Sequence, residues 1–188
     1  MLELPFWVLI KKMENNKLEN TYESKNFITQ TYFKTKVWLA VRIANIKRDD
    51  VILDFGCGDG WLEKKLKDYE IYGYDINPEK TFIKDYKTIV PTKIFVLDVF
   101  EHIPEKEIIK LLNNFKRLNK KFDLIVSVPT ENWLSRKVRK LVGKSEVPEE
   151  HITNHKKIFD ILKSNFKLKK RINFFTVSKI FIFKYNSQ

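Results

Sequence analysis

The stretch VILDFGCGDGWLEKKLKDYEIYGYDIN, residues 51–77, decides the fold. Its pattern predicts a short apolar strand, a glycine turn, a helix and a second strand that ends at Asp75. Three of the five glycines of the chain, Gly56, Gly58 and Gly60, lie in this turn. Glycines allow a sharp turn and a close approach of a ligand to the backbone. In a doubly wound sheet such a turn lies at the carboxyl ends of the strands, where ligands bind.

Two acidic residues beside the turn indicate the kind of ligand. Asp54 lies two residues before the first glycine, where a carboxylate would repel a pyrophosphate and suit a cationic ligand. Asp75 ends the second strand, where a carboxylate can accept hydrogen bonds from both hydroxyls of a ribose. The spacing G-x-G-x-G also differs from the G-x-G-x-x-G of nicotinamide and flavin proteins. The turn therefore predicts a site for a cationic nucleoside.

The rest of the chain continues the alternation of strands and helices. Apolar runs predict strands over 93–99 and 122–128, and apolar residues at helical spacing predict helices over 24–46, 104–118 and 154–165. Pro78 is expected to open a short helix over 78–87. Alternating residues after 165 predict two antiparallel strands. We expect an α/β fold with a mostly parallel sheet and a C-terminal hairpin, in a single domain (1–188) with an N-terminal helical segment (1–47) and a core (48–188).

Composition indicates the possible partners of the chain and its location. The net charge of +12 favours contact with nucleic acid, an anionic membrane surface or phosphorylated substrates. The alternative is a lysine-rich chain whose spread charges maintain solubility. Cys57 is the single cysteine, so no internal disulfide forms, and we expect a cytoplasmic location. The apolar run that ends at Lys11 is shorter than the ~20 residues of a membrane span, and is expected to pack on the domain or lie on a membrane surface.

With these motifs the chain resembles the class I, Rossmann-like methyltransferases that use S-adenosylmethionine, in particular the small-molecule branch with the ubiquinone and menaquinone methyltransferases. The similar segments are LDFGCGDG (53–60), YGYDIN (72–77), LDVFEHIP (97–104) and FDLIVSVP (122–129). The resemblance implies that Asp54, Gly56 and Gly58 surround the methionine part of the cofactor. It also implies that Asp75 holds the ribose and that Asp98 faces the methyl group.

The chain departs from that family after the second motif. The family has a further strand there, whereas only residues 76–92 separate the second strand from the strand at Lys93. An edge strand at 87–90 would lie about 14 Å sideways from the next strand, and Pro91-Thr92 reaches at most about 10 Å. A parallel crossover also needs about a dozen residues. The edge strand is therefore expected to be missing, which leaves one side of the adenine pocket unassigned.

Histidines provide the candidate catalytic residues. His102 follows the strand of Asp98, and His151 lies beyond the last parallel strand. Both segments are expected at the carboxyl edge of the sheet, where an imidazole can deprotonate a hydroxyl acceptor near neutral pH. One alternative is a metal, because Asp98, Glu101 and His102 with a later histidine resemble the pattern of metal-dependent O-methyltransferases, including the small-RNA 2′-O-methyltransferases. Another is that Glu101 and His102 cap the helix that begins at Pro104.

The methyl acceptor is indicated by features outside the cofactor motifs. Residues 131–144 combine Trp133 and Leu134 with a cationic face. This pattern is typical of an ordinary amphipathic helix, of a substrate lid or membrane-surface helix, or of a nucleic-acid contact. No N-P-P-[YFW] tetrapeptide of amino-group methylation follows the strand at 93–99. We expect methyl transfer to an oxygen or carbon of a small or lipid-like acceptor. The alternatives are RNA methylation and a cofactor-binding regulatory subunit without activity.

Overall fold

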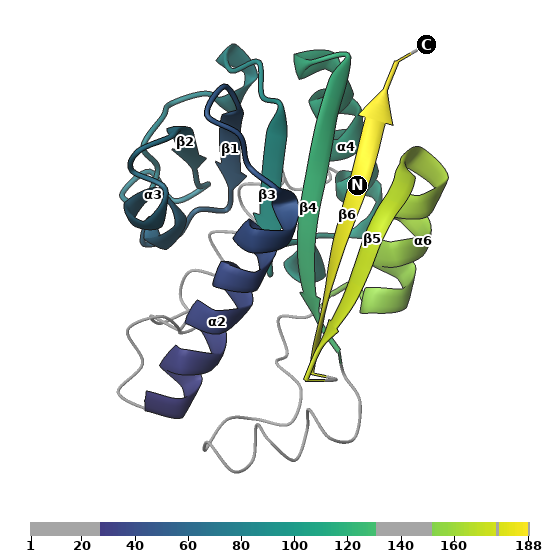
Figure 1. Ribbon diagram of the computed structural model, residues 1–188. Coiled ribbons are helices and arrows are strands. Elements are labelled where there is room, and N and C mark those ends of the chain that lie inside the picture. Colours follow the sequence, from purple (N-terminus) through teal and green to yellow (C-terminus); the bar gives the residue numbers. More distant parts are fainter. Residues whose placement is uncertain (1–26, 131–151, 176, 188) are drawn as a thin grey trace.

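The computed structural model describes residues 27–130, 152–175 and 177–187. In this part of the chain six strands form one sheet in the order β2-β1-β3-β4-β6-β5 (Figure 1). The strands are β1 (Val51–Phe55), β2 (Glu70–Tyr74), β3 (Lys93–Leu97), β4 (Lys121–Pro129), β5 (Lys167–Phe174) and β6 (Ser178–Asn186). The first four run parallel, and β6 is antiparallel to β4 and β5. This confirms the predicted α/β fold and its C-terminal hairpin.

Helices cover both faces of the sheet (Figure 1). Helices α2 (Phe27–Ala44) and α3 (Trp61–Lys65) pack on one face, where Ala40 and Leu62 meet Ile125 in one core cluster. Helices α4 (Glu105–Leu118) and α6 (His155–Asn165) pack on the other face, together with the 3-10 turn η1 (Tyr86–Thr88). A second 3-10 turn, η2 (Phe100–His102), precedes α4. None of the described helices is both long and apolar enough to cross a membrane.

Helices α4 and α6 follow from local sequence rules. Helix α4 buries Ile108, Leu111, Leu112 and Phe115, which recur at the three- and four-residue spacing that places side chains on one face of a helix. Helix α6 begins after Asn154, whose side-chain oxygen accepts the backbone N–H groups of Lys156 and Lys157. Such a cap stabilises a helix by about 1 kcal/mol.

The expected loss of the edge strand is confirmed, because β2 ends the sheet and no described strand lies beyond it. The predicted helix over 78–87 is wrong: the segment holds the 3-10 turn η1 and otherwise irregular backbone. The physical reason is a competing hydrogen-bond partner. A single turn forms first, in which the N–H groups of Lys80 and Thr81 donate to the carbonyl of Asn77. The N–H groups of Phe82 and Ile83 then donate to the carbonyl of Gly73, at 3.0 and 3.2 Å, so the stretch binds the end of β2 and does not continue as a helix.

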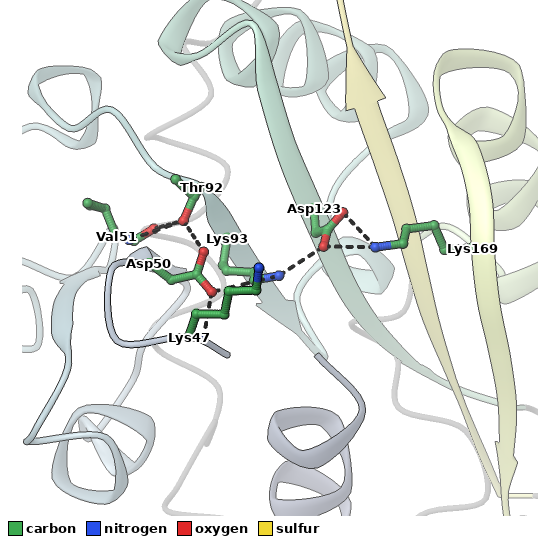
Figure 2. Close-up of polar contacts among 7 residues, drawn as sticks. All are labelled: Lys47, Asp50, Val51, Thr92, Lys93, Asp123 and Lys169. Carbon is green, nitrogen blue, oxygen red and sulfur yellow. Dashed lines mark hydrogen bonds and ion pairs between the residues drawn. The ribbon is translucent and has the colours of Figure 1, made fainter. Parts of the chain in front are cut away.

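A polar network joins the strands at their amino ends (Figure 2). The Lys93 ammonium lies 2.9 Å from Asp123 and 3.8 Å from Asp50, and Lys169 contacts Asp123 at 3.1 Å. Burial alone would raise the pKa of the Asp123 carboxyl group, but the hydrogen bonds and charges of Lys93 and Lys169 hold this pKa below its ordinary value. Thr92 extends the network by donating to Asp50 at 2.6 Å. This network holds β1, β3, β4 and β5 together at the edge opposite the glycine turn.

Candidate active site

The glycine turn adopts a backbone that suits close approach of a ligand. Gly56, Gly58 and Gly60 have φ values of 85°, 52° and 67°, which side chains disfavour. The N–H of Gly56 donates to the carbonyl of Tyr74 at 2.7 Å and so ties the turn to β2. A Cβ atom on Gly56 would overlap the side chain of Val99, whereas one on Gly58 would point into open space. The surface above Gly58 is therefore open to a ligand.

Asp75 is held at the edge of this open surface. Its two carboxylate oxygens accept the backbone N–H groups of Gly58 and Asn77, each at 2.9 Å. Each oxygen of an ionised carboxylate has two lone-pair sites, so Asp75 keeps room for two hydroxyl donors. The structure thus places Asp75 beside Gly58, with its carboxylate orientation set by backbone groups.

Two more carboxylates, those of Asp54 and Glu63, lie close to the turn. Asp54 is 4% exposed at the end of β1, and Glu63 of α3 lies close enough to influence its ionisation. Burial raises the pKa of Asp54 well above its usual value, and the negative charges of Glu63 and Asp75 raise it further. Burial and the same three carboxylates also raise the pKa of the Cys57 thiol. A cation bound beside these carboxyl groups would favour their charged forms, so the cluster suits a cationic ligand.

Glu63 was not among the residues predicted from sequence. Both of its carboxylate oxygens are shielded from solvent and have no hydrogen-bond partner in the described part of the chain. A Cβ atom on Gly73 would overlap this carboxylate, so the glycine of β2 makes room for it. Burial raises the pKa of Glu63 to about 7, although its own backbone amide and Lys64 act in the opposite direction.

We expect Glu63→Gln to remove a pH-dependent loss of stability. The pKa of Glu63 is about 7 in the folded chain, against an ordinary value of 4.5. As the pH rises between these values the unfolded chain loses the proton first, so the wild type loses stability, and the loss levels off above about pH 7. Because part of the Glu63 side chain contacts solvent although its carboxylate oxygens are shielded, we expect a loss of about 1–2 kcal/mol between pH 5 and 8.

Urea unfolding at pH 5 and pH 8 measures this difference. Glu63→Gln should change less between the two pH values than the wild type. The matched control is Glu79→Gln, which removes the same charge from an exposed position and should keep the wild-type pH dependence. A wild-type free energy of unfolding that stays level or rises over this pH range would contradict the assignment.

Asp98, at the carboxyl end of β3, is engaged by two other elements. Its carboxylate forms an ion pair with Lys36 of α2 and accepts the Ser127 hydroxyl of β4 at 2.8 Å. Lys36 is only 2% exposed, and its ammonium lies 4.4 Å from the centre of the Phe33 ring. The backbone of Asp98 has a φ of 55°, a conformation uncommon outside glycine and found at functional sites.

An aromatic cluster lies next to this ion pair. The ring centres of Tyr32 and Phe174 are 5.2 Å apart, and those of Phe174 and Phe175 are 4.7 Å apart. The Tyr32 hydroxyl lies 2.6 Å from the Ser178 hydroxyl oxygen at the start of β6. Phe175 is 72% exposed at the tip of the hairpin. We call Tyr32, Phe33, Phe174 and Phe175 the aromatic mouth; it lies at the carboxyl edge of β4, because Ser178 pairs with Pro129.

Of the two candidate catalytic histidines, one lies in the described part of the chain. His102 is half-buried in η2, four residues after Asp98, whereas His151 lies outside the described residues, as do Trp133, Leu134 and the rest of 131–144. The N–H groups of Ile152 and Thr153 donate to the carbonyl of Glu101, at 2.7 and 3.1 Å. The chain next to His151 therefore reaches the turn of His102. Among the described residues, no cluster of three or more histidine, cysteine or acidic side chains suits a metal ion.

Some of the residues that complete the site could have been recognised in the sequence. Lys36 lies between Phe33 and Ala40 on the buried stripe of its helix, where a lysine is unusual and implies a partner. Ser127 is the polar interruption of an otherwise apolar run on β4. Glu63 carries no such signal in the sequence. It lies three residues after the last glycine of the turn, in the first turn of a helix, and the sequence pattern there fits an exposed side chain as well as a buried one.

Comparisons with known proteins agree with this geometry. A family model described as a methyltransferase domain matches residues 33–162. Magnesium protoporphyrin IX methyltransferase from Synechocystis PCC 6803, solved with bound S-adenosylmethionine, is 19% identical, with all of both chains covered and a TM-score of 0.65. A protein from Pyrococcus horikoshii OT3 is 13% identical over 92% of this chain and 99% of that one, with a TM-score of 0.69. No curated protein matches the sequence significantly.

The sheet order and the glycine turn define the class as the Rossmann-like methyltransferase fold. The structural likenesses show the fold alone, since identities are low, but the family model covers more than half of the chain. The chain belongs to this methyltransferase-domain family and is an S-adenosylmethionine-dependent methyltransferase. The residues present fit that cofactor: the surface at Gly58 is open, Asp75 is oriented beside it, and the buried carboxylates favour a cation.

Proposed function

We propose that the chain transfers the methyl group of S-adenosylmethionine to an oxygen or carbon nucleophile of a small or lipid-like acceptor. The observation that carries the proposal is the aromatic mouth beside the Asp98–Lys36 pair. Aromatic rings contribute large apolar contacts and bind flat or lipid-like molecules by stacking and burial. Because Lys36 neutralises the neighbouring Asp98, this carboxylate would not repel an anionic nucleophile.

Each part of the cofactor has a candidate partner in this chain. Asp75 accepts the ribose hydroxyls, Gly56 and Gly58 let the backbone approach the methionine part, and Asp54 attracts its amino group. Ile76, exposed next to Asp75, offers an apolar surface for the adenine. The bound cofactor supplies a methyl group already activated by its sulfonium. The protein then has to align the acceptor and exclude water.

A proton must leave a hydroxyl acceptor when the methyl group is transferred. His102 and His151 stay our candidates for its removal, since an imidazole accepts protons near neutral pH. The assignment to the ubiquinone and menaquinone branch rests on the sequence motifs and is part of the proposal. Contact of the cationic segment 131–144 with an anionic membrane surface is a further part, and would bring a lipid-like acceptor to the mouth.

A transfer assay tests the proposal. The full chain is incubated with methyl-labelled S-adenosylmethionine and a cell extract, which is then separated into lipid-soluble, small-molecule, RNA and protein fractions. We expect the label in the lipid-soluble or small-molecule fraction. Phe175→Ala should lower transfer several-fold, through the lost aromatic contact, and leave cofactor affinity unchanged. Ile109→Ala, which truncates an exposed apolar side chain on α4, is the matched control and should behave as wild type.

Other outcomes identify the alternatives. Label in the RNA fraction, with RNA binding that weakens steeply with salt, would replace the acceptor that we propose by RNA. Tight cofactor binding without transfer to any fraction would instead indicate a regulatory subunit. Equal transfer by Phe175→Ala and wild type would remove the aromatic mouth from the acceptor path.

A further inference from the structure

A hollow lies away from the glycine turn, between the start of α6 and the hairpin of β5 and β6. Its volume is about 290 Å³. The side chains that line it come from α6 (His155, Lys156, Phe159 and Asp160), from β5 (Arg171) and from β6 (Lys179 and Phe181). Three separate elements thus bring cationic side chains to one concave surface.

Among the described residues that line this hollow, cationic side chains outnumber acidic ones. Lys156, Arg171 and Lys179 form no ion pair with any residue of the described part of the chain, and Asp160 is the single acid among the described residues of the lining. Burial lowers the pKa of Lys179, and the positive charges of Arg171 and Lys156 lower it further. Cations that lie close enough to repel one another are stabilised by an anion between them.

Aromatic rings give the hollow a fixed shape. The ring centres of Phe159 and Phe181 are 5.0 Å apart, and the Arg171 guanidinium lies 5.5 Å from the Phe159 ring centre. This stacking limits the freedom of the Arg171 side chain, and a guanidinium held in one orientation can bind two oxygens of a phosphate at once. Lys156 lies in the first turn of α6, where the helix dipole adds positive potential.

The hollow is separate from the aromatic mouth, although Lys179 follows Ser178 in the chain. Neighbouring residues of a strand point to opposite faces of the sheet. Ile180 packs in the core cluster of α2, whereas Phe181 packs in the cluster of α6. Lys179 is two residues from Phe181 and therefore points to the same face as Phe181. Ser178, which contacts Tyr32, is two residues from Ile180 and points to the opposite face. The sheet itself therefore lies between the hollow and the mouth.

We propose that this hollow is an anion site that binds a phosphate monoester group. Arg171 contacts two phosphate oxygens, Lys156 and Lys179 supply the remaining positive charge, and the Phe159 ring packs against the organic part of the ligand. A phosphorylated small molecule and the headgroup of a phosphomonoester lipid present the same chemistry to these residues. The site is independent of methyl transfer, so it can be tested without knowing the acceptor.

Titration of the full chain with inorganic phosphate at low ionic strength tests the site. Backbone amide shifts in NMR spectra report both affinity and location, and we expect the largest shifts at residues 155–160 and at Arg171. The variant Arg171→Gln/Lys179→Gln should bind phosphate about tenfold more weakly or worse, because two charge-assisted contacts are lost. Thermal unfolding confirms that the variant is folded, and Arg171→Gln alone should show the same direction of change.

The matched control removes two positive charges from elsewhere on the same elements. Lys163→Gln/Lys170→Gln changes an exposed lysine of α6 and one of β5 that pairs with Ile182, a residue of the opposite face. This variant should stay within about twofold of the wild type. Equal weakening in both double variants would show that phosphate follows the general charge of the protein, and would overturn the proposal. Absence of shifts around the hollow in the wild type would do the same.

Vesicles distinguish the two sources of the phosphate. Phosphatidylcholine vesicles with phosphatidic acid carry the monoester, and vesicles with phosphatidylglycerol of matched surface charge carry a diester. A preference for phosphatidic acid that Arg171→Gln/Lys179→Gln loses would support the site with a lipid as its ligand. Phosphate binding at the hollow without that preference would support it with a soluble ligand.

Discussion

Replacing Asp75 with alanine is expected to weaken S-adenosylmethionine binding by about 2–3 kcal/mol, or about 30- to 150-fold. The carboxylate accepts the backbone N–H groups of Gly58 and Asn77 and lies beside the open surface of the turn. Alanine removes the acceptor for two ribose hydroxyls, and hydrogen bonds to a charged group are among the stronger ones in proteins. Calorimetric titration of the wild type and the variant with S-adenosylmethionine measures the change.

The matched control for Asp75→Ala is Asp49→Ala. Asp49 is exposed in the loop before β1, at the opposite edge of the sheet. Its replacement therefore removes the same charge without affecting the turn. We expect it to bind the cofactor like the wild type. Unchanged affinity in Asp75→Ala would mean that the ribose is held elsewhere. A wild type that binds NAD and ignores S-adenosylmethionine would overturn the assignment of the whole site.

The fold was predictable because its main determinants are local. The glycine turn, the apolar runs of β1 and β4 and the stripe of α4 each specify an element within a few residues. Even the missing edge strand followed from chain length, since Pro91 and Thr92 cannot span the sheet. The helix expected over 78–87 failed for a non-local reason. Gly73 belongs to another element, and its carbonyl attracts the amides of Phe82 and Ile83.

The candidate site was predictable only where a motif carries its residues. Asp54 lies near the end of β1, and Asp75 and Asp98 directly follow β2 and β3, so the topology alone brings all three to one edge. Their partners depend on packing between distant segments. Lys36 reaches Asp98 from a helix 62 residues earlier in the chain. The Glu63 carboxylate is shielded from solvent because β2 has a glycine opposite it. The basic hollow also depends on three elements that the sequence places far apart.

Replacing Lys36 with methionine is expected to lower the free energy of unfolding by about 2–4 kcal/mol. Methionine keeps most of the apolar stem, so the change mainly removes the ammonium that pairs with Asp98. The remaining carboxylate still accepts the hydrogen bond of the Ser127 hydroxyl. It also keeps contact with water, since the Asp98 side chain is 19% exposed. The cost therefore falls below that of a fully buried charge without a partner. Urea unfolding at pH 7 measures it, with Lys34→Met on the same helix as the matched control.

A double variant separates the lost ion pair from lost packing. In Lys36→Met/Asp98→Asn a neutral amide replaces the carboxylate, and the asparagine oxygen can still accept a hydrogen bond from the Ser127 hydroxyl. If the penalty of Lys36→Met comes from an uncompensated charge, the double variant should recover most of the lost stability, as buried pairs that are replaced by neutral side chains commonly do. A double variant as unstable as Lys36→Met would assign the loss to packing against Phe33. A Lys36→Met chain as stable as the wild type would mean that the pair does not hold α2 on the sheet. The first of these three outcomes follows from the geometry, because Lys36 is buried where its charge has one acidic partner among the described residues.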